Sequence, residues 1–170
     1  MQSLLKKVPK TPLLVAKYPT GLDDKLHDFE CAVLPQEGQE QNEQVTVVGI
    51  VGMGGIGKTT LAKQIFNYRC SLYDGYSFLS DVRETAARKS LVDLKMQLIK
   101  DLTHRDIKIE TMDQGLMILK RYLACCNAMI ILDNVEKVDQ LYAFLPIRDV
   151  LSYNSLILVT SQDMHALLCS

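Results

Sequence analysis

The sequence predicts an α/β fold, in which a mostly parallel sheet carries helices on both of its faces. The first observation is a set of four short apolar runs, which are typical of strands buried on both sides. The second is that stretches with apolar residues at helical spacing separate these runs, the alternation that produces a helix-covered parallel sheet. The four runs are Val45 to Val51, Tyr76 to Leu79, Ala128 to Leu132 and Leu156 to Thr160.

The bulk composition agrees with one globular domain and excludes several other classes. The chain has 170 residues, of which 48% are hydrophobic and 23% charged, so it can bury a core without a metal or disulfide. A formal net charge of -1 gives no basic field, and we expect no nucleic-acid partner. No apolar run has the length of a membrane span or a signal peptide. Five cysteines without a Cys-x-x-Cys pair suit a reducing compartment, so we expect a cytoplasmic location, with the nucleus also compatible.

Residues 1–44 are predicted to form an extended N-terminal arm, a short helix and a polar linker, which precede a domain of residues 45–170. Prolines and lysines mark the arm up to about residue 17. Leu22, Leu26 and Phe29 then share one face of a short helical pattern. The stretch Gln36 to Gln44 has no apolar residue, which indicates a flexible connector.

Four further helices are predicted between the strands from apolar residues that recur every three or four positions. Their ranges are Lys58 to Tyr68, Leu91 to Leu102, Met112 to Leu123, and Val138 to Leu145 before Pro146. Tyr68 is expected on the buried stripe of the first, and Ser90 with Asp93 is placed as a cap for the second. The stripes of the second and third are expected to form core, with some residues exposed where other subdomains would dock. A last helical turn is expected from Met164 to Leu168.

A glycine-rich turn joins the first predicted strand to the helix that follows it and matches the pattern of a P-loop. Its residues are Gly52, Met53, Gly54, Gly55, Ile56, Gly57, Lys58, Thr59 and Thr60. The glycines let several backbone N–H groups point inward as an anion nest, and the helix N-terminus adds a partial positive charge. Lys58 is expected to reach the terminal phosphates, the Thr59 hydroxyl to ligate Mg²⁺, and Thr60 to act near the α-phosphate. The predicted fold is therefore that of a P-loop NTPase.

An acidic residue follows the third apolar run, where a P-loop site needs a carboxylate. Asp133 is predicted to hold Mg²⁺ or its water shell together with Thr59, partly through water. Asn134 occupies the next position, where many ATPases carry a second acid that polarises the attacking water. Because an amide cannot accept a proton at neutral pH, we expect slow hydrolysis or none. Glu136 is acidic, but alternation or a turn can point it elsewhere.

The order of these segments resembles the NB-ARC module of plant intracellular immune receptors, the nucleotide-binding leucine-rich-repeat class. The lead-in from Val8 to Leu26 and the P-loop, extended through Leu61 and Ala62, are similar to the first two blocks of that family. Three further blocks follow in the same order. They are Phe78 to Glu84 in the form of TIR-type receptors, Ile130 to Glu136 at the acidic strand, and Leu156 to Asp163 at the sensor strand.

The resemblance implies an ADP/ATP-binding module of a STAND P-loop NTPase, which acts as a nucleotide-dependent switch in defence signalling. ADP would be held at rest and ATP in the activated form, with Mg²⁺, and Tyr18 to Leu22 would lie near the adenine. Three features depart from the family pattern, the first being Asn134 in place of the second acid. Gln162 replaces the arginine that senses the γ-phosphate, and the sequence stops before the helical and winged-helix subdomains. We therefore interpret the chain as a partial NB-ARC module, truncated after the sensor strand.

Three other classes compete with this interpretation. A GTPase would need a glycine three residues after Asp133 and a lysine in the block Thr160 to Asp163, and both are missing. A small-molecule kinase would need an arginine-rich lid, whereas Arg83, Arg88 and Arg105 are scattered. A degenerate interaction module with weak nucleotide binding stays open. In that case, surfaces normally covered by the missing subdomains would bind protein partners or self-associate.

Overall fold

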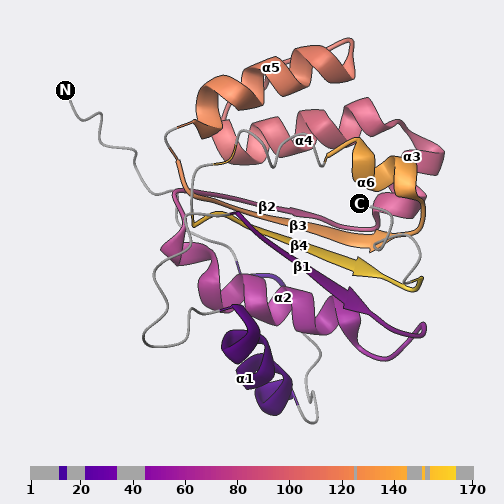
Figure 1. The fold of residues 1–170 in the computed structure, drawn as a ribbon. Coiled ribbons are helices and arrows are strands. Elements are labelled where there is room, and N and C mark those ends of the chain that lie inside the picture. The colour runs from indigo at the N-terminus through magenta and orange to yellow at the C-terminus, as the bar shows by residue number, and fades with distance from the viewer. Residues whose placement is uncertain are drawn as a thin grey trace.

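Four parallel strands form one sheet, in the order β1-β4-β3-β2, in the computed structural model of this chain (Figure 1). They are β1 (Thr46–Val51), β2 (Gly75–Leu79), β3 (Ala128–Val135) and β4 (Leu156–Ser161). The structure describes residues 12–14, 22–33, 45–124, 126–144, 151 and 154–163. Most of the predicted arm, the connector at 36–44 and the helical turn expected at 164–168 lie outside the described residues.

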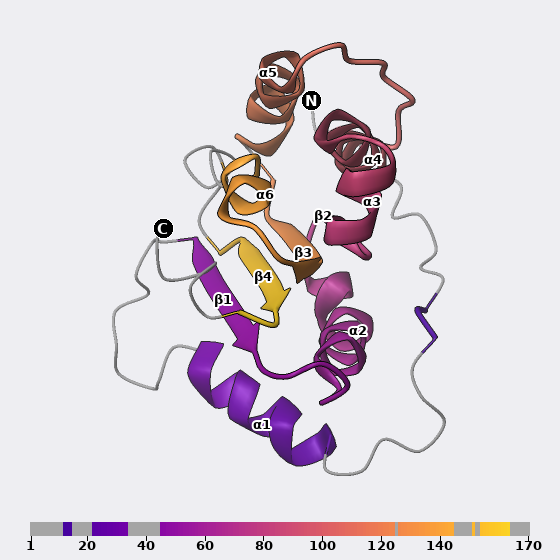
Figure 2. The same cartoon turned by 90° about the vertical axis from the view of Figure 1, so that its right-hand side faces the viewer.

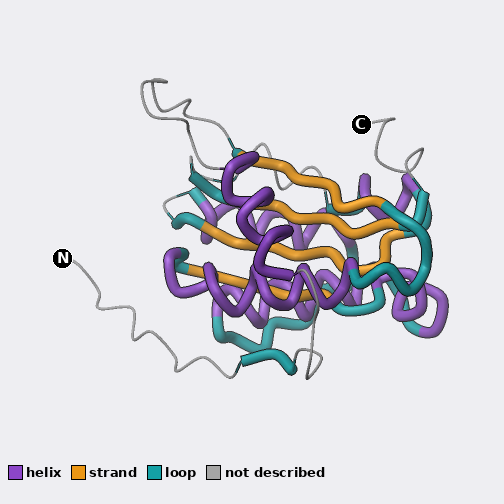
Figure 3. Tube along the Cα trace, turned by 90° about the horizontal axis from the view of Figure 1, so that it is seen from below, coloured by secondary structure: helices purple, strands orange, loops and turns teal. Residues whose placement is uncertain are grey.

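Helices cover both faces of this sheet, so the predicted α/β class is confirmed. One face carries α1 (Leu22–Val33) and α2 (Lys58–Arg69), which is followed by the short 3-10 helix η1 (Cys70–Leu72). Seen from that side, α1 and α2 lie in front of the strands (Figure 3). The other face carries α3 (Val82–Arg88), α4 (Leu91–Thr103), α5 (Met112–Leu123) and α6 (Val138–Tyr142) (Figure 1). Of these, α5 packs on the outer side of α4, while α4 packs on β2.

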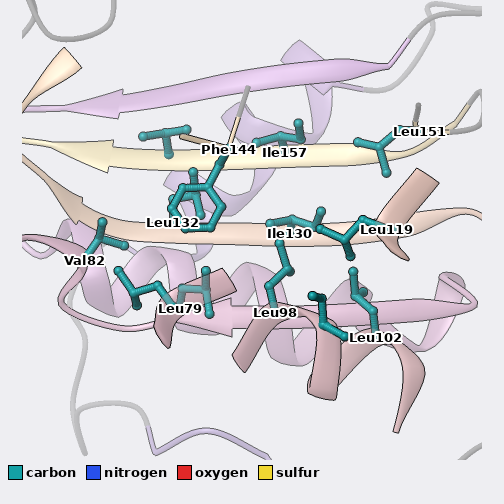
Figure 4. Close-up of a cluster of buried hydrophobic side chains, with 14 of the residues drawn as sticks. Leu79, Val82, Leu98, Leu102, Leu119, Ile130, Leu132, Phe144, Leu151 and Ile157 are labelled. Atoms are coloured by element: carbon teal, nitrogen blue, oxygen red, sulfur yellow. The ribbon is translucent and has the colours of Figure 1, made fainter. Parts of the chain in front are cut away.

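The two faces have separate hydrophobic cores because successive residues of a strand point to opposite sides. Toward α3–α6, Ile130, Leu132 and Ile157 pack against leucines of α4 and α5, including Leu98 and Leu119 (Figure 4). Toward α2, aromatic side chains contribute more. Phe66 stands edge-on to Tyr76 and Phe78, with ring centroids 5.7 and 5.6 Å apart. The strands between these cores are buried on both faces, as their near-continuous apolar sequences predict.

Most predicted elements occur within two residues of their expected ends. The predicted cap of α4 is confirmed, because the Asp93 N–H donates to Ser90 Oγ at 3.1 Å. Tyr68 was expected on the buried stripe of α2, and this prediction is wrong. Its side chain is 64% exposed, whereas Ala62, Ile65 and Phe66 of the same helix are buried. The leucine stripes of α4 and α5 lie in the core, as expected.

Two features of the strands differ from the sequence prediction. The first is that β1 is an edge strand of the described sheet, so Val47 is 42% exposed where a fully buried strand was expected. The second is that β3 continues three residues beyond Leu132, through Asp133 to Val135. Figure 2 looks onto the carboxyl ends of the strands, where the loop from β1 to α2 lies beside the ends of β4 and β3. This edge collects the predicted site residues.

Candidate functional site

The loop from β1 to α2 has the backbone shape of an anion nest. Gly55 and Gly57 adopt left-handed φ values of 80° and 94°, a region that side chains with a Cβ rarely enter. Gly57 is also the N-cap of α2, and the first turn of that helix contains no acidic residue. The unpaired N–H groups and the positive end of the helix dipole therefore meet at the loop. An anionic group such as a phosphate fits this position.

The Lys58 ammonium lies across the start of the same loop. Its Nζ donates to the carbonyl oxygens of Gly52 at 2.6 Å and Met53 at 2.8 Å. An ammonium has three protons, so these two bonds leave one for another acceptor. Lys58 thus holds the loop and still presents a positive charge beside the nest. By contrast, the side chains of Met53 and Ile56 are 78% and 57% exposed.

Thr59 in the first turn of α2 contacts Asp133 of β3, which is 74 positions away in the sequence. The Thr59 hydroxyl lies 2.9 Å from Asp133 Oδ1 and 3.2 Å from Oδ2. Asp133 is only 1% exposed, which limits its interactions to the groups of this edge. A hydroxyl and a carboxylate are the hard oxygen donors that Mg²⁺ prefers. Within the described residues, no group of three or more His, Cys, Asp or Glu side chains converges on a metal position, so water would supply further ligands here.

Asp133 does not end the strand, as the sequence prediction assumed, but lies inside a β-bulge. Leu132 pairs with Val159 and Val135 with Ser161, so three steps along β3 match two steps along β4. Asn134 is the extra residue of the bulge and has a left-handed φ of 59°. Thr160 of β4 bonds to both bulge residues: its hydroxyl accepts from the Asn134 N–H at 2.8 Å and donates to Asp133 Oδ1 at 2.7 Å.

Gln162 follows β4 and reaches the P-loop from the side. A Cβ built on Gly54 would lie 3.7 Å from Gln162 Oε1 and 3.8 Å from Nε2. The carboxamide therefore lies directly beside the loop, at the position where the sequence comparison expected an arginine. Glu136 points elsewhere, because it pairs with Arg83 at 3.4 Å. Of the acidic groups considered from the sequence, only Asp133 is described in contact with a P-loop residue.

Comparison with known proteins identifies the fold and the family. Residues 34–167 match the NB-ARC domain. The chain belongs to the NB-ARC family. Its relatives include the disease resistance proteins RUN1 and RPV1 of Vitis rotundifolia, at 32% and 33% identity over 116 residues. These alignments cover 67% of this chain but only 9% and 8% of the relatives. The chain therefore spans about a tenth of the length of the curated relatives it matches.

A solved structure supports the fold assignment independently. The crystal structure of Cdc6p from Pyrobaculum aerophilum superimposes with a TM-score of 0.68 at 14% sequence identity. The superposition covers 93% of this chain and 43% of that one, and at this identity it concerns the fold alone. The chain is thus a P-loop nucleotide-binding domain of the NB-ARC family, the kind found in plant disease-resistance proteins. The predicted resemblance and fold class are confirmed.

Most predicted site residues of this NB-ARC domain come together, and one unpredicted residue joins them. The loop from Gly52 to Gly57, Lys58, Thr59 and Asp133 meet at one edge, whereas the Thr60 side chain has no described contact there. Thr160 was not predicted as a site residue. The available signal was a polar residue at the end of the apolar run of β4, because the carboxyl ends of adjacent parallel strands meet at one edge of the sheet.

No helix among the described residues combines the length and apolar character needed to cross a bilayer.

Proposed function

We propose that the chain binds ADP or ATP with Mg²⁺ and serves as a nucleotide-dependent switch in defence signalling, with slow hydrolysis or none. The contact between Thr59 and Asp133 beside the anion nest is the observation that carries this proposal. It joins the two hard oxygen donors that a magnesium–phosphate complex needs to the loop that would hold the phosphates. The defence role is supported by the names of the related disease resistance proteins.

Each residue of the P-loop has a distinct role in this proposal. The backbone from Gly52 to Thr60 would bind the phosphates through its N–H groups. Lys58 would donate its third proton to a terminal phosphate oxygen. Thr59 and Asp133 would hold Mg²⁺, partly through water, and bound Mg²⁺ would neutralise phosphate charge.

Two amides stand where ionisable groups would favour turnover. The carboxamide of Asn134 cannot take a proton from an attacking water at neutral pH. Gln162 is neutral beside Gly54, so it cannot stabilise growing negative charge as strongly as a guanidinium would. Both substitutions favour holding a nucleotide over cleaving it. Left-handed φ values are tolerated by Asn and Asp, so Asn134→Asp is compatible with the backbone at this position.

Calorimetric titration with ADP and ATP, with and without Mg²⁺, tests the binding. Lys58→Ala should weaken binding at least about 30-fold, because a direct charge–phosphate contact is lost. Lys63→Ala is the matched control, since it removes the same charge from the same helix and has no described contact with the loop. Equal affinities for wild type and Lys58→Ala would contradict the site. A preference for GDP or GTP would contradict the adenine assignment.

Steady-state phosphate release tests the second part of the proposal. Wild type should turn over less than about once per minute, well below typical enzymes. Asn134→Asp is expected to raise this rate because a carboxylate can serve as the proton acceptor. Wild-type turnover of many ATP molecules per second would show that the chain does not need a second acid at position 134.

A second candidate function is an interaction module with weak nucleotide binding. It is favoured by exposed apolar side chains on β1 and on the loop that follows it, namely Val47, Met53 and Ile56. Light scattering after gel filtration distinguishes it. The interaction module is supported if the wild type self-associates and the double variant Met53→Ser, Ile56→Ser does not. A monodisperse monomer that binds nucleotide tightly contradicts it.

We further propose a cytoplasmic or nuclear location and no nucleic-acid partner. Cys31, Cys70 and Cys126 are free thiols in the described part of the chain, which suits a reducing compartment. The net charge of -1 offers no basic surface for a phosphate backbone. Imaging of a fluorescent fusion checks the location, and a gel-shift assay with duplex DNA and single-stranded RNA should show no complex.

A further inference from the structure

We propose that Thr160 is a positioning residue for the magnesium ligand Asp133, and that its hydroxyl is required for Mg²⁺ to strengthen nucleotide binding. This inference rests on the proposed function, and it concerns a residue with no described side-chain contact to the P-loop. It follows from the β-bulge of β3 and from the hydrogen bonds that hold it.

The bulge needs a partner from outside the backbone ladder. Leu132 and Val135 both pack into the core on the α3–α6 side, although a regular strand would place them on opposite faces. The left-handed backbone of Asn134 allows both side chains to face the same side of the sheet, and the Asn134 N–H donates to Thr160 Oγ1 at 2.8 Å. Bulges commonly change the direction of a side chain beside a functional site. Here the side chain concerned is Asp133.

The same hydroxyl fixes the Asp133 carboxylate. Thr160 has one hydroxyl proton, and because its oxygen accepts from Asn134, that proton is left to bond Asp133 Oδ1, 2.7 Å away. Thr160 and Asp133 are each 1% exposed, so solvent has little access to replace a lost bond. Thr160 therefore determines the orientation of the carboxylate in a setting where few alternative partners exist.

Thr59 and Thr160 together leave one carboxylate oxygen less engaged. Thr59 Oγ1 is nearer to Oδ1, at 2.9 Å, than to Oδ2, at 3.2 Å, and Thr160 donates to Oδ1 as well. A carboxylate oxygen can accept two hydrogen bonds, so Oδ1 is saturated by the two threonines. Oδ2 is then the oxygen available to a metal ion or to one of its waters. Loss of the Thr160 hydroxyl would allow the Asp133 carboxylate to rotate, so that either of its oxygens could accept the hydrogen bond from Thr59.

The test compares ADP dissociation constants in Mg²⁺ and in EDTA, measured by calorimetry. The ratio of the EDTA value to the Mg²⁺ value is the magnesium effect. Thr160→Val keeps the shape but removes the hydroxyl, and it should lower the magnesium effect about ten-fold, as loss of a group that orients a metal ligand does. Its Kd in EDTA should stay within about two-fold of wild type, because the phosphate nest is untouched. Thr160→Ser restores the hydroxyl and should restore the magnesium effect.

Ser77→Ala is the matched control for general loss of a buried hydroxyl. Ser77 of β2 is 1% exposed and donates to Asp101 of α4 at 2.6 Å, the same hydroxyl–carboxylate bond on another strand. This variant should lose stability and keep the wild-type magnesium effect. If Thr160→Val does not fold, as judged by circular dichroism, Thr160→Ala provides the same comparison with Thr160→Ser.

The outcomes separate this inference from the function on which it rests. A wild type that binds no nucleotide, or binds it without a magnesium effect, overturns the proposed function. A wild type with a magnesium effect that Thr160→Val or Thr160→Ala retains in full overturns the role of Thr160 alone. Equal losses in Ser77→Ala and Thr160→Val would show a general effect of destabilisation and would also overturn it.

Discussion

The carboxyl edge around Asp133 and the layer formed by α4 and α5 both bury charged side chains, but they surround them differently. At the edge, Asp133 accepts from two threonine hydroxyls at 2.9 and 2.7 Å. In the layer, Lys95 is 2% exposed. Its Nζ lies 3.4 Å from the Met112 carbonyl oxygen, a longer contact, and 6.0 Å from the centroid of the Phe144 ring.

Burial in the layer shifts two of its charged groups, Lys95 and Asp101, toward their neutral forms. Burial lowers the pKa of Lys95, and the nearby Asp113 carboxylate opposes this only in part. Burial likewise raises the pKa of Asp101, against the opposing hydrogen bond from Ser77. Asp133 is thus held by two threonine hydroxyls at the edge, whereas burial of Lys95 and Asp101 in the layer reduces stability. Variants of the layer should change stability without changing nucleotide affinity, whereas edge variants should change nucleotide affinity.

The largest expected effect comes from the apolar part of the layer. Leu98 of α4 is fully buried in the core shown in Figure 4. Leu98→Ala should lower the free energy of unfolding by about 3 kcal/mol, because it leaves a cavity. Met117→Ala on α5, where the side chain is 56% exposed, should change it by less than about 0.5 kcal/mol. Urea denaturation measures the free energy of unfolding of both variants. Under conditions in which each variant is fully folded, its affinity for ADP should match that of the wild type.

Gly115 of α5 gives the next largest effect. A Cβ at this position would lie 2.6 Å from Lys95 Cδ and 2.7 Å from Ile109 Cδ1, so these neighbours must shift to admit it. Overpacking of this kind costs about 1–3 kcal/mol, and the better helix propensity of alanine offsets about 1 kcal/mol of it. Gly115→Ala should therefore destabilise by about 1 kcal/mol. The cost should shrink in a Lys95→Ala background, and an unchanged cost there would contradict the Lys95 contact.

Replacing the buried ammonium should stabilise the protein. Lys95→Met keeps an unbranched chain and removes the charge, so we expect a gain of about 1 kcal/mol at pH 7. The folded pKa of Lys95 lies below its unfolded value, so the gain is full below the folded pKa and decreases as the pH rises toward about 10.4. Lys100→Met, whose side chain is 58% exposed and pairs with Asp106, should give no gain. Denaturation midpoints across this pH range test both variants.

Asp101→Asn should have the smallest effect, with the opposite dependence on pH. The folded pKa of Asp101 is raised, so its charge reduces stability above that pKa. The variant should therefore be more stable at pH 7, and this gain should vanish as the pH falls to the unfolded value of about 3.9. Because Asp101 is partly exposed, water limits the gain to about 0.5 kcal/mol or less. A loss of stability at pH 7 would mean that the charged hydrogen bond with Ser77 outweighs burial.

The sequence was sufficient to predict features carried by one continuous segment. The strands, the long helices and the P-loop each repeat a local pattern, and Asp133 follows an apolar run at the position a P-loop site requires. The sequence predictions failed where a feature lacks a local pattern or depends on contacts with residues far away in the sequence. Only Val82 is buried in α3, so this short helix has no apolar stripe to detect. In the extension of β3, the Asn134 N–H bonds to the hydroxyl of Thr160, which the register of a different strand brings into place.

The left-handed glycines of the P-loop also have a consequence for the kinetics of ligand capture. Gly55 and Gly57 already have the φ values of a nest, and two Lys58 hydrogen bonds tie the loop to its own carbonyl oxygens. A preorganised site can bind its ligand without a slow conformational change. Stopped-flow mixing with a fluorescent ADP analogue should therefore give a single phase whose rate rises linearly with concentration. Differences in affinity among P-loop variants should then appear mainly as differences in residence time.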